Sequence, residues 1–464
     1  MSERVRIREI LTGLGYNPPL DITYNRIYEW MAWYSGVVND FHKYFVYNGL
    51  QQVPCQRHTL GMAKKVCEDW ANLLLNEKVE IVTSSKKMDK QLKKVLQSNN
   101  YRVRANQLVE LSFALGTGAF VEYKDINGKV LIDYIRAEMI FPLSWENGEI
   151  RECAFGSSRV DGKEEYIYVQ IHRLGREDIG EDASSYYIEN LYYTLDGRSK
   201  EGKTDRTVCT GSDKPLFQII KPNICNNIDL DSPMGISVYA NAIDQLKGCD
   251  LTYDSYINEF VLGKKRIIVP MSMAKIEMGR PDQKGHVIRP VFDPNDTIFY
   301  ALPGEVNGNG NQKISENNME IRAEQHELGI QRMLDSLSLK VGMGNSRYKY
   351  VSGSVKTATE VISEKSDLYQ NLCKNKLILD TALRNMVGTI FFLLGSKVDI
   401  DKIGINFDDS IITDKQSEMK NDLQLVTAGI MQKWEFRVKY FRETEAQAKA
   451  AMQPTETDLF PGDE

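Results

Sequence analysis

The clearest hydrophobic pattern lies in the last third of the chain and predicts one long helix. Thr357 and Glu360 have the spacing of a capping box, which marks a helix start. Beyond them, apolar residues recur at helical spacing until Leu394, and Gly395 is the next strong stop signal. The pattern therefore predicts a helix of about 38 residues, about 57 Å long at 1.5 Å per residue.

A second unusual helix is predicted over residues 236–262. Its apolar residues follow a strict three-four alternation, which is typical of a narrow seam between packed helices. Ser237 can cap its start and Gly263 can end it. Asp250 is the polar residue in the seam. It either fixes the register between neighbouring helices or lies beside solvent, and we favour the solvent interpretation.

Short β patterns interrupted by prolines follow over residues 263–314. Ser315 is expected to open another helix that continues to Lys340. Two helices therefore bracket a small β insertion, and the second one leads through a loop into the long helix.

The N-terminal half changes its periodicity near Gly118. Before that point, apolar patterns predict helices near residues 27–34 and 59–75, and five lysines at 86, 87, 90, 93 and 94 are best interpreted as a solvated helix face. From there to about Pro222, alternation and Asx-Gly turns predict antiparallel hairpins, with loops at 178–185 and 196–213.

The C-terminal segment 414–452 has helical patterning. Its candidates for buried positions are Leu423, Val426, Ile430, Trp434 and Phe441. From Pro454 onward the chain is acidic, lacks a packing face and is expected to be disordered. The whole pattern predicts an α+β fold.

Composition limits the function classes. The 464 residues carry a formal charge of −6, which argues against a protein that binds nucleic acid over its whole surface. The N-terminus lacks the apolar core of a signal peptide, and the richest apolar run, Met386 to Leu394, is too short to cross a membrane. Seven cysteines without a C-x-x-C pair predict reduced core residues, with no disulfide and no structural zinc.

The loop from Lys340 to Lys356 is the candidate binding segment. No acidic residue occurs between Asp335 and Glu360, and glycines at 342, 344 and 353 allow several backbone paths. The loop predicts contact with a polyanion, unless its cations only pair with neighbouring acids. The candidate contact residues are Lys340, Arg347, Tyr348, Lys349 and Lys356.

Four blocks of residues, taken in order, resemble the portal proteins of tailed bacteriophages, particularly those of Gram-positive hosts. They begin at Met62 (Met-Ala-Lys-Lys-Val-Cys-Glu-Asp-Trp), Pro233 (Pro-Met-Gly-Ile-Ser-Val-Tyr, with the helix that leads to Lys264-Lys-Arg-Ile-Ile-Val-Pro), Lys356 (Lys-Thr-Ala-Thr-Glu-Val-Ile-Ser) and Asn406 (Asn-Phe-Asp-Asp-Ser-Ile, with the later Thr427-Ala-Gly-Ile-Met). The third block is the most specific, and the order of the four is more informative than any one of them.

The resemblance implies a ring of subunits, usually twelve, at one vertex of the capsid, through which double-stranded DNA is packaged and ejected. It implies these divisions: an N-terminal wing (1–235), a first stem helix (236–262), a clip (263–314), a second stem helix (315–340), a tunnel loop (341–356), a wing segment with the long helix and a strand (357–412), a crown (413–452) and a disordered acidic tail (453–464).

The same resemblance implies partners and places. The terminase large subunit and a head–tail adaptor protein would dock on the ring, and the major capsid and scaffolding proteins would surround it. The location would be the virion, and the host cytoplasm during assembly. Channel-lining candidates on the first stem helix are Asp244, Lys247, Asp250, Asp254 and Glu259, and those at the clip base are Lys264, Lys265 and Arg266.

Simple geometry agrees with a ring. Twelve helices side by side, at about 10 Å each, need a circumference of about 120 Å and leave a hole roughly 28 Å wide, enough for a DNA duplex. A channel must also release DNA, so acids on its wall would limit sticking while a few cations touch the duplex. Such a ring needs two different contact patches on each subunit.

An enzyme and another assembly protein are the competing hypotheses. The chain has no phosphate-binding G-x-x-x-x-G-K-[ST] loop, and its five histidines, at 42, 58, 172, 286 and 326, have no metal-binding spacing and are expected to be structural. Asp229 with Asp231, or Asp408 with Asp409 and Asp414, could hold a divalent ion in a nucleic-acid-processing enzyme, although turn and cap roles are favoured. A scaffold or adaptor is the third alternative. We expect no catalytic residue, no metal and no cofactor.

Overall fold

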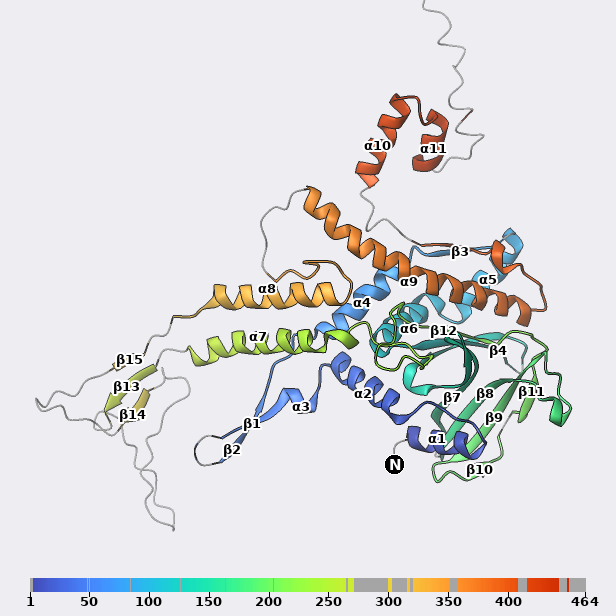
Figure 1. The fold of residues 1–464 in the computed structure, drawn as a ribbon, viewed down its shortest axis with the longest axis horizontal. Coiled ribbons are helices and arrows are strands. Elements are labelled where there is room, and N and C mark those ends of the chain that lie inside the picture. The colour runs from blue at the N-terminus through green and yellow to red at the C-terminus, as the bar shows by residue number, and fades with distance from the viewer. Residues whose placement is uncertain are drawn as a thin grey trace, which may run out of the picture.

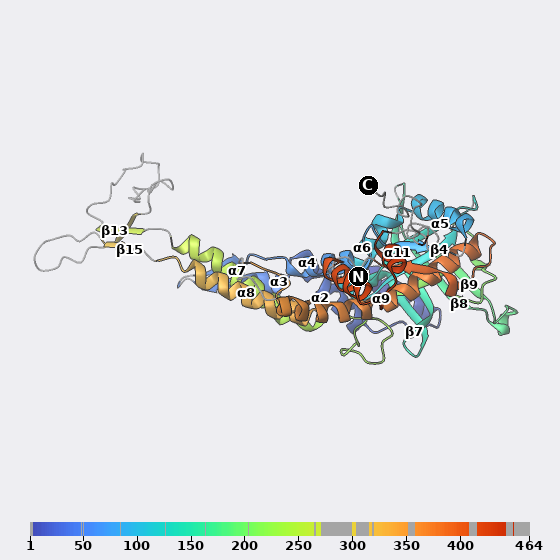
Figure 2. The ribbon, with the colours of Figure 1, turned by 90° about the horizontal axis from the view of Figure 1, so that it is seen from above.

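The computed structural model describes residues 3–47, 49, 51–83, 85–125, 127–162, 164–202, 204–263, 266–270, 299–302, 315–317, 320–350, 358–407, 415–441 and 449. Most of these residues form a mixed helical and β body. A two-helix arm extends from the body to a small sheet at the far end (Figures 1 and 2).

The helical half of the body is built around Trp70 and Phe113, whose rings lie 5.6 Å apart. The predicted helices near 27–34 and 59–75 are confirmed, as is the solvated lysine face, which lies on α5. The elements are α1 (Glu3–Gly13), α2 (Asp21–Ser35), α3 (Asn39–His42), α4 (Met62–Leu74), α5 (Lys86–Ser98) and α6 (Tyr101–Leu115), with a hairpin of β1 (Lys43–Tyr47) and β2 (Gln52–Gln56) after α3.

The β half of the body consists of antiparallel hairpins, as predicted. One sheet has the order β12-β4-β5 and the larger one β10-β9-β8-β7-β6, with β11 paired to β9. The strands are β4 (Gly118–Lys124), β5 (Val130–Arg136), β6 (Ile140–Glu146), β7 (Glu149–Asp161), β8 (Glu164–Leu174), β9 (Tyr186–Thr194), β10 (Ser199–Lys200), β11 (Thr207–Cys209) and β12 (Phe217–Ile220).

The segment 196–213 corrects the expectation of a plain loop. Its short strands β10 and β11 both add to β9, so the polar segment extends the sheet edge. The Asn147-Gly148 turn does have the predicted geometry, because both residues have positive φ values, 52° and 77°.

The arm consists of α7 (Ile243–Leu262) and α8 (Ala323–Lys340), which both start later than predicted. Before α7, Val238 N–H donates to the Phe113 carbonyl (2.9 Å) and Tyr239 Oη donates to the Trp30 carbonyl (2.8 Å). Residues 236–239 therefore belong to the body. In the sequence they have the same apolar spacing as the helix, but the helix itself starts at Ile243. Gly263 does follow the last helical residue.

Ser315 opens a strand instead of a helix. In the small sheet, β15 (Ser315–Asn317) pairs antiparallel with β13 (Arg266–Pro270), and β14 (Phe299–Leu302) pairs parallel with β13. The rest of the predicted β insertion, residues 271–298 and 303–314, lies outside the described residues.

The long helix is α9 (Ala358–Leu393), which has 36 residues and confirms the predicted length. It crosses the β12-β4-β5 sheet and α4, and Gly395 ends the segment with a φ of 75° (Figure 1). Thr357, the predicted cap, lies outside the described residues. After α9, β16 (Gly404–Asn406) pairs with β3 (Glu80–Val82).

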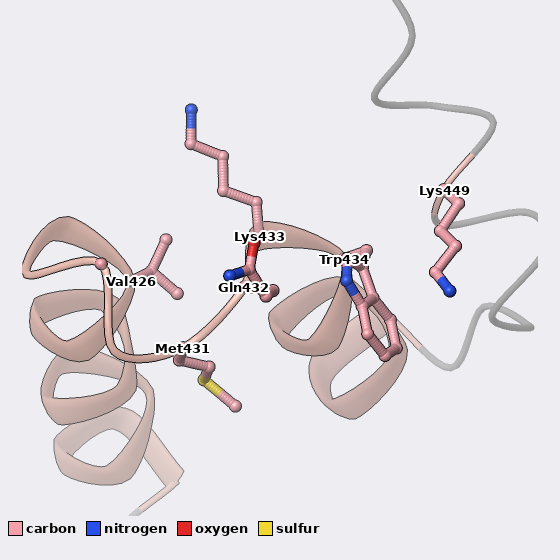
Figure 3. A pocket seen from close by; sticks show the side chains of 7 residues that line it. Val426, Met431, Gln432, Lys433, Trp434 and Lys449 are labelled. Carbon is pink, nitrogen blue, oxygen red and sulfur yellow. The ribbon is translucent and has the colours of Figure 1, made fainter.

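The C-terminal helices are α10 (Lys415–Thr427) and α11 (Lys433–Phe441). Leu423 and Ile430 are exposed, so their predicted burial is wrong, and Phe436 is the buried aromatic residue. Two short helices cannot enclose a core of their own. They leave an open pocket lined by Val426, Met431, Trp434 and neighbouring residues (Figure 3).

All seven cysteines are free. Cys67, Cys153 and Cys249 are buried, and burial raises the pKa of each thiol. Cys209 and Cys225 are exposed, so the prediction of core cysteines is wrong for these two.

Candidate functional site: the basic loop and the two-helix arm

The first half of the basic loop is held in one conformation. Ser338 Oγ on α8 donates to the Gly344 carbonyl (2.7 Å) and accepts from Arg347 N–H (3.3 Å). Gln331 Nε2 donates to the Tyr348 carbonyl (2.9 Å), and Gln331 Oε1 accepts from Tyr350 N–H (2.7 Å). The loop therefore folds back along α8 from Val341 to Tyr350.

The body holds the loop from the other side. Trp70 Nε1 donates to the Val341 carbonyl (3.1 Å), and Asn371 Nδ2 on α9 donates to the Gly342 carbonyl (3.2 Å). Gly342 and Gly344 have φ values of 77° and 78°, which a side chain would strain. These glycines therefore permit one tight path in the described half of the loop, where the sequence suggested several.

Three of the five predicted contact residues are available for an anion. Lys340, Arg347 and Lys349 are exposed, and within the described part of the chain none of them forms an ion pair. Tyr348 is a correction, because its side chain is buried in the core and burial raises the pKa of its hydroxyl. The fifth residue, Lys356, lies outside the described residues.

Asp250 and Asp254 on α7 are corrections to the channel-lining prediction and to the solvent interpretation of Asp250. Both are buried. Asp250 accepts hydrogen bonds from Leu60 N–H (2.7 Å), Thr59 Oγ1 (3.2 Å) and His42 Nε2 (2.9 Å). Because Val38 N–H donates to His42 Nδ1 (3.0 Å), the proton on Nε2 is the one that points to Asp250.

Asp254 makes the parallel set of contacts one turn later. It accepts from the backbone N–H and from Nδ1 of His58, both at 2.9 Å, and from Asn258 Nδ2 at 3.1 Å. The two acids therefore bind the segments on either side of the β1–β2 hairpin to the arm. In this structure the two carboxylates serve as hydrogen-bond acceptors for these segments and do not line a channel.

Of the remaining arm candidates, two are exposed and Glu259 is half-buried. Asp244 and Lys247 are exposed and lie 3.5 Å apart as an ion pair. Glu259 binds Arg322 through two contacts of 3.0 and 2.9 Å, which lower the pKa of Glu259 to about 2. Glu259 therefore joins the ends of α7 and α8. Lys264 and Lys265 lie outside the described residues, and Arg266 is the first residue of β13.

No histidine in the described residues is placed for chemistry. His172 is buried between Phe155 and Phe217, and burial lowers the pKa of its imidazole to about 3. His42, His58 and His326 all contact carboxylates. His286 lies outside the described residues.

No metal or membrane site emerges from the described ranges. Within them, no three His, Cys, Asp or Glu side chains gather where they could hold a metal ion. Asp408, Asp409 and Asp414 lie outside these ranges. None of the described helices combines the length and the apolarity that crossing a membrane requires.

Comparison with known proteins identifies the family. The profile of the family described as "Phage portal protein, SPP1 Gp6-like" matches residues 20–456, which is nearly the whole chain. The chain therefore belongs to the SPP1-like family of phage portal proteins, which are structural proteins of the virion. No curated protein matches this chain.

Solved structures also resemble the chain. One of them is described as the neck of a native GTA particle. It shares 13% sequence identity with a TM-score of 0.40, and the match covers 82% of this chain and 89% of that chain.

Proposed function

We propose that this chain forms a head-to-tail ring, of about twelve subunits, that conducts double-stranded DNA through one capsid vertex. The observation that carries the proposal is the basic loop, which hydrogen bonds hold in one conformation and which is called the pinned loop below. In a member of the portal family, three unpaired cations are held at the end of α8, where a ring of arms would surround a duplex.

The charges suit a conduit. Each cation that neutralises a phosphate adds to a salt-dependent affinity, so a few cations from each subunit can touch the backbone without clamping it. Hydrogen bonds to Ser338, Gln331 and Trp70 fix the loop backbone against α8 and the body. The cations therefore start from a defined position along the proposed channel axis.

The other divisions of the chain follow the same proposal. The arm is the stem, and the small sheet β13–β15 is the clip, on which the terminase large subunit and later a head–tail adaptor dock. The body is the wing, which faces the major capsid and scaffolding proteins. Helices α10 and α11 belong to the crown. Assembly takes place in the host cytoplasm.

The test is a double substitution, Arg347→Ala with Lys349→Ala, in assembled particles. Because both side chains are exposed and unpaired, the melting temperature should not change. Packaged DNA, or its retention, should decrease. The control is Lys129→Ala with Lys214→Ala, two exposed lysines on the body.

Two results would count against the proposal. Normal DNA content and retention in the loop variant would leave the loop as a connector only. Native mass spectrometry that finds only monomer over a range of salt concentrations would argue against a ring.

A further inference from the structure

The β1–β2 hairpin leaves one face of aromatic side chains uncovered. Phe45 pairs with Pro54 and Tyr47 with Gln52, so these residues share one face of the ribbon. Phe45 is 66% exposed and Tyr47 is 67% exposed. An isolated two-stranded ribbon is marginally stable, so this face needs a partner.

The position of the hairpin is fixed on the arm. His42 directly precedes β1 and contacts Asp250, and His58 closely follows β2 and contacts Asp254. The Arg57 guanidinium lies over the Tyr44 and Phe41 rings, 4.3 and 4.9 Å from their centroids, at the hairpin base. The exposed face is therefore presented in a defined place.

The hairpin and α8 lie on opposite sides of α7 (Figure 1). On α7, Gly248 is next to Met333, Tyr256 bonds Glu327 and Glu259 bonds Arg322, all on or next to α8. At about 100° per residue, Asp250 and Asp254 point away from that side. The order across one subunit is therefore hairpin, α7, α8.

The outer side of α8 exposes two apolar side chains. Ile330, Leu334 and Leu337 are buried on the inner side, whereas Leu328 and Leu339 are 58% and 62% exposed on the outer side. Ile321, two residues before the helix, lies against the end of α7, because a Cβ on Gly263 would be 3.4 Å from Ile321 Cγ1. Leu328 and Leu339 are therefore the unpartnered apolar side chains on the outer side of α8.

We propose that the exposed hairpin face of one subunit packs on the outer side of α8 of the next subunit. The inference rests on the proposed ring, in which the order hairpin, α7, α8 repeats around the axis. A head-to-tail interface requires two different patches on each subunit, and the arm carries them on opposite sides.

The two patches match in height along the arm. His42 is level with Asp250, and the hairpin runs obliquely from there, toward the far end of the arm and away from α7 (Figure 1). At about 3.3 Å per strand residue, Phe45 lies at most about 10 Å beyond His42, which is at most about 7 residues along α7. Because Tyr256 contacts Glu327 on α8, Leu328 lies within that range of heights.

The exposed area of the two rings is a substantial part of a subunit interface. Phe45 and Tyr47 together leave roughly 250 Å² uncovered, if each ring buries about 200 Å² when covered. That is about a third of what each partner contributes to a standard interface of about 800 Å² per side.

The first test is Phe45→Glu with Tyr47→Glu, compared with the control Val160→Glu with Ile179→Glu, two exposed apolar residues on the body. Native mass spectrometry and light scattering measure ring assembly against concentration. We expect the hairpin variant to need at least about tenfold more protein to assemble, with circular dichroism unchanged, and the control to assemble like the wild type. Rings that form as readily as the wild type would overturn the inference, whereas a wild type that forms no rings would instead overturn the proposed function.

The second test does not depend on loss of assembly. Phe45→Cys with Leu328→Cys is oxidised in a background in which Cys55, Cys209 and Cys225 are serine. We expect a ladder of linked chains on a non-reducing gel and no ladder from either single variant. Intact rings without a ladder, or hairpin variants that lose only the binding of an adaptor protein, would show that the hairpin does not contact the next subunit.

Discussion

Glu122→Gln tests how the long helix is seated on the body. Glu122 lies in β4 beneath α9, and both of its carboxyl oxygens are buried without a hydrogen-bond partner among the described residues. Gln218 is a nearby amide, but its Nε2 donates to Thr389 Oγ1 on α9 (3.4 Å). Burial therefore raises the pKa of Glu122 well above its ordinary value of 4.5.

The magnitude follows from proton linkage. The unfolded chain releases this proton near pH 4.5, whereas the folded chain keeps it, so folding takes up a proton above that pH. The free energy of unfolding therefore falls by about 1.4 kcal/mol for each pH unit, until the pH reaches the raised pKa of the folded state. Glutamine has the same shape and no proton to lose, so the variant should lack this slope.

The assay is the melting temperature of the wild type and Glu122→Gln between pH 5 and pH 8. The difference should grow in favour of the variant by about 1–2 °C per pH unit until the folded carboxyl ionises, because a chain of 464 residues has an unfolding entropy of about 1 kcal/mol/K. Glu165→Gln, at an exposed position of β8, is the control and should show a constant difference. A constant difference for Glu122→Gln as well would refute the reasoning, because it would mean that the buried carboxyl is not held protonated.

Three further predictions concern named contacts. Asp250→Ala should lower the free energy of unfolding by about 1–3 kcal/mol in urea titrations, because it leaves buried donors unpaired. The control Asp244→Ala, at an exposed position, should change the free energy of unfolding by less than about 0.5 kcal/mol. Equal effects of the two substitutions would contradict the burial of Asp250. Arg173→Met should cost about 3–5 kcal/mol by the same measurement, since Arg173 is buried between Glu181 and Glu189, and a neutral result would contradict this. The Arg322 hydrogen bonds that lower the pKa of Glu259 to about 2 should stabilise the arm fully above pH 4.5 and be lost as the pH falls through about 2. Amide exchange at the C-terminal end of α7 should show this loss in the wild type and not in Glu259→Gln.

Much of the fold could be predicted because periodicity reports burial directly. The long helix, the hairpins between residues 118 and 174 and the helix around Trp70 all have uninterrupted patterns. The start of α7 could not be predicted in this way. Residues 236–239 keep the helical period, but Gly235 and Gly116 bring their backbones so close that a Cβ on Gly116 would lie 2.6 Å from the Gly235 carbonyl oxygen. This long-range approach holds the segment in the body.

The candidate site was less predictable, because the sequence shows charge and not its partners. Lys340, Arg347 and Lys349 are exposed as predicted, whereas Tyr348, between two of them, is buried by a fold-back that depends on Ser338 and Gln331. The sequence alone does not separate the buried Asp250 and Asp254 from the exposed Asp244, because all three are aspartates in the same predicted helix. Their partners, His42 and His58, are about two hundred residues away in the chain, and only the packed structure brings them together.

The contacts of α7 divide its circumference in a way that bears on the channel. One side meets α8, another holds the hairpin segments through Asp250 and Asp254, and a third carries Asp244, Lys247, Leu251 and Ser255, all exposed. If the hairpin covers the next subunit's α8, the third side is the one left free by the ring contacts. Its two charges compensate each other at 3.5 Å. A face with no net charge offers the phosphates of a passing duplex neither a strong attraction nor a strong repulsion, so the contact with DNA would be concentrated at Arg347 and Lys349 in the pinned loop.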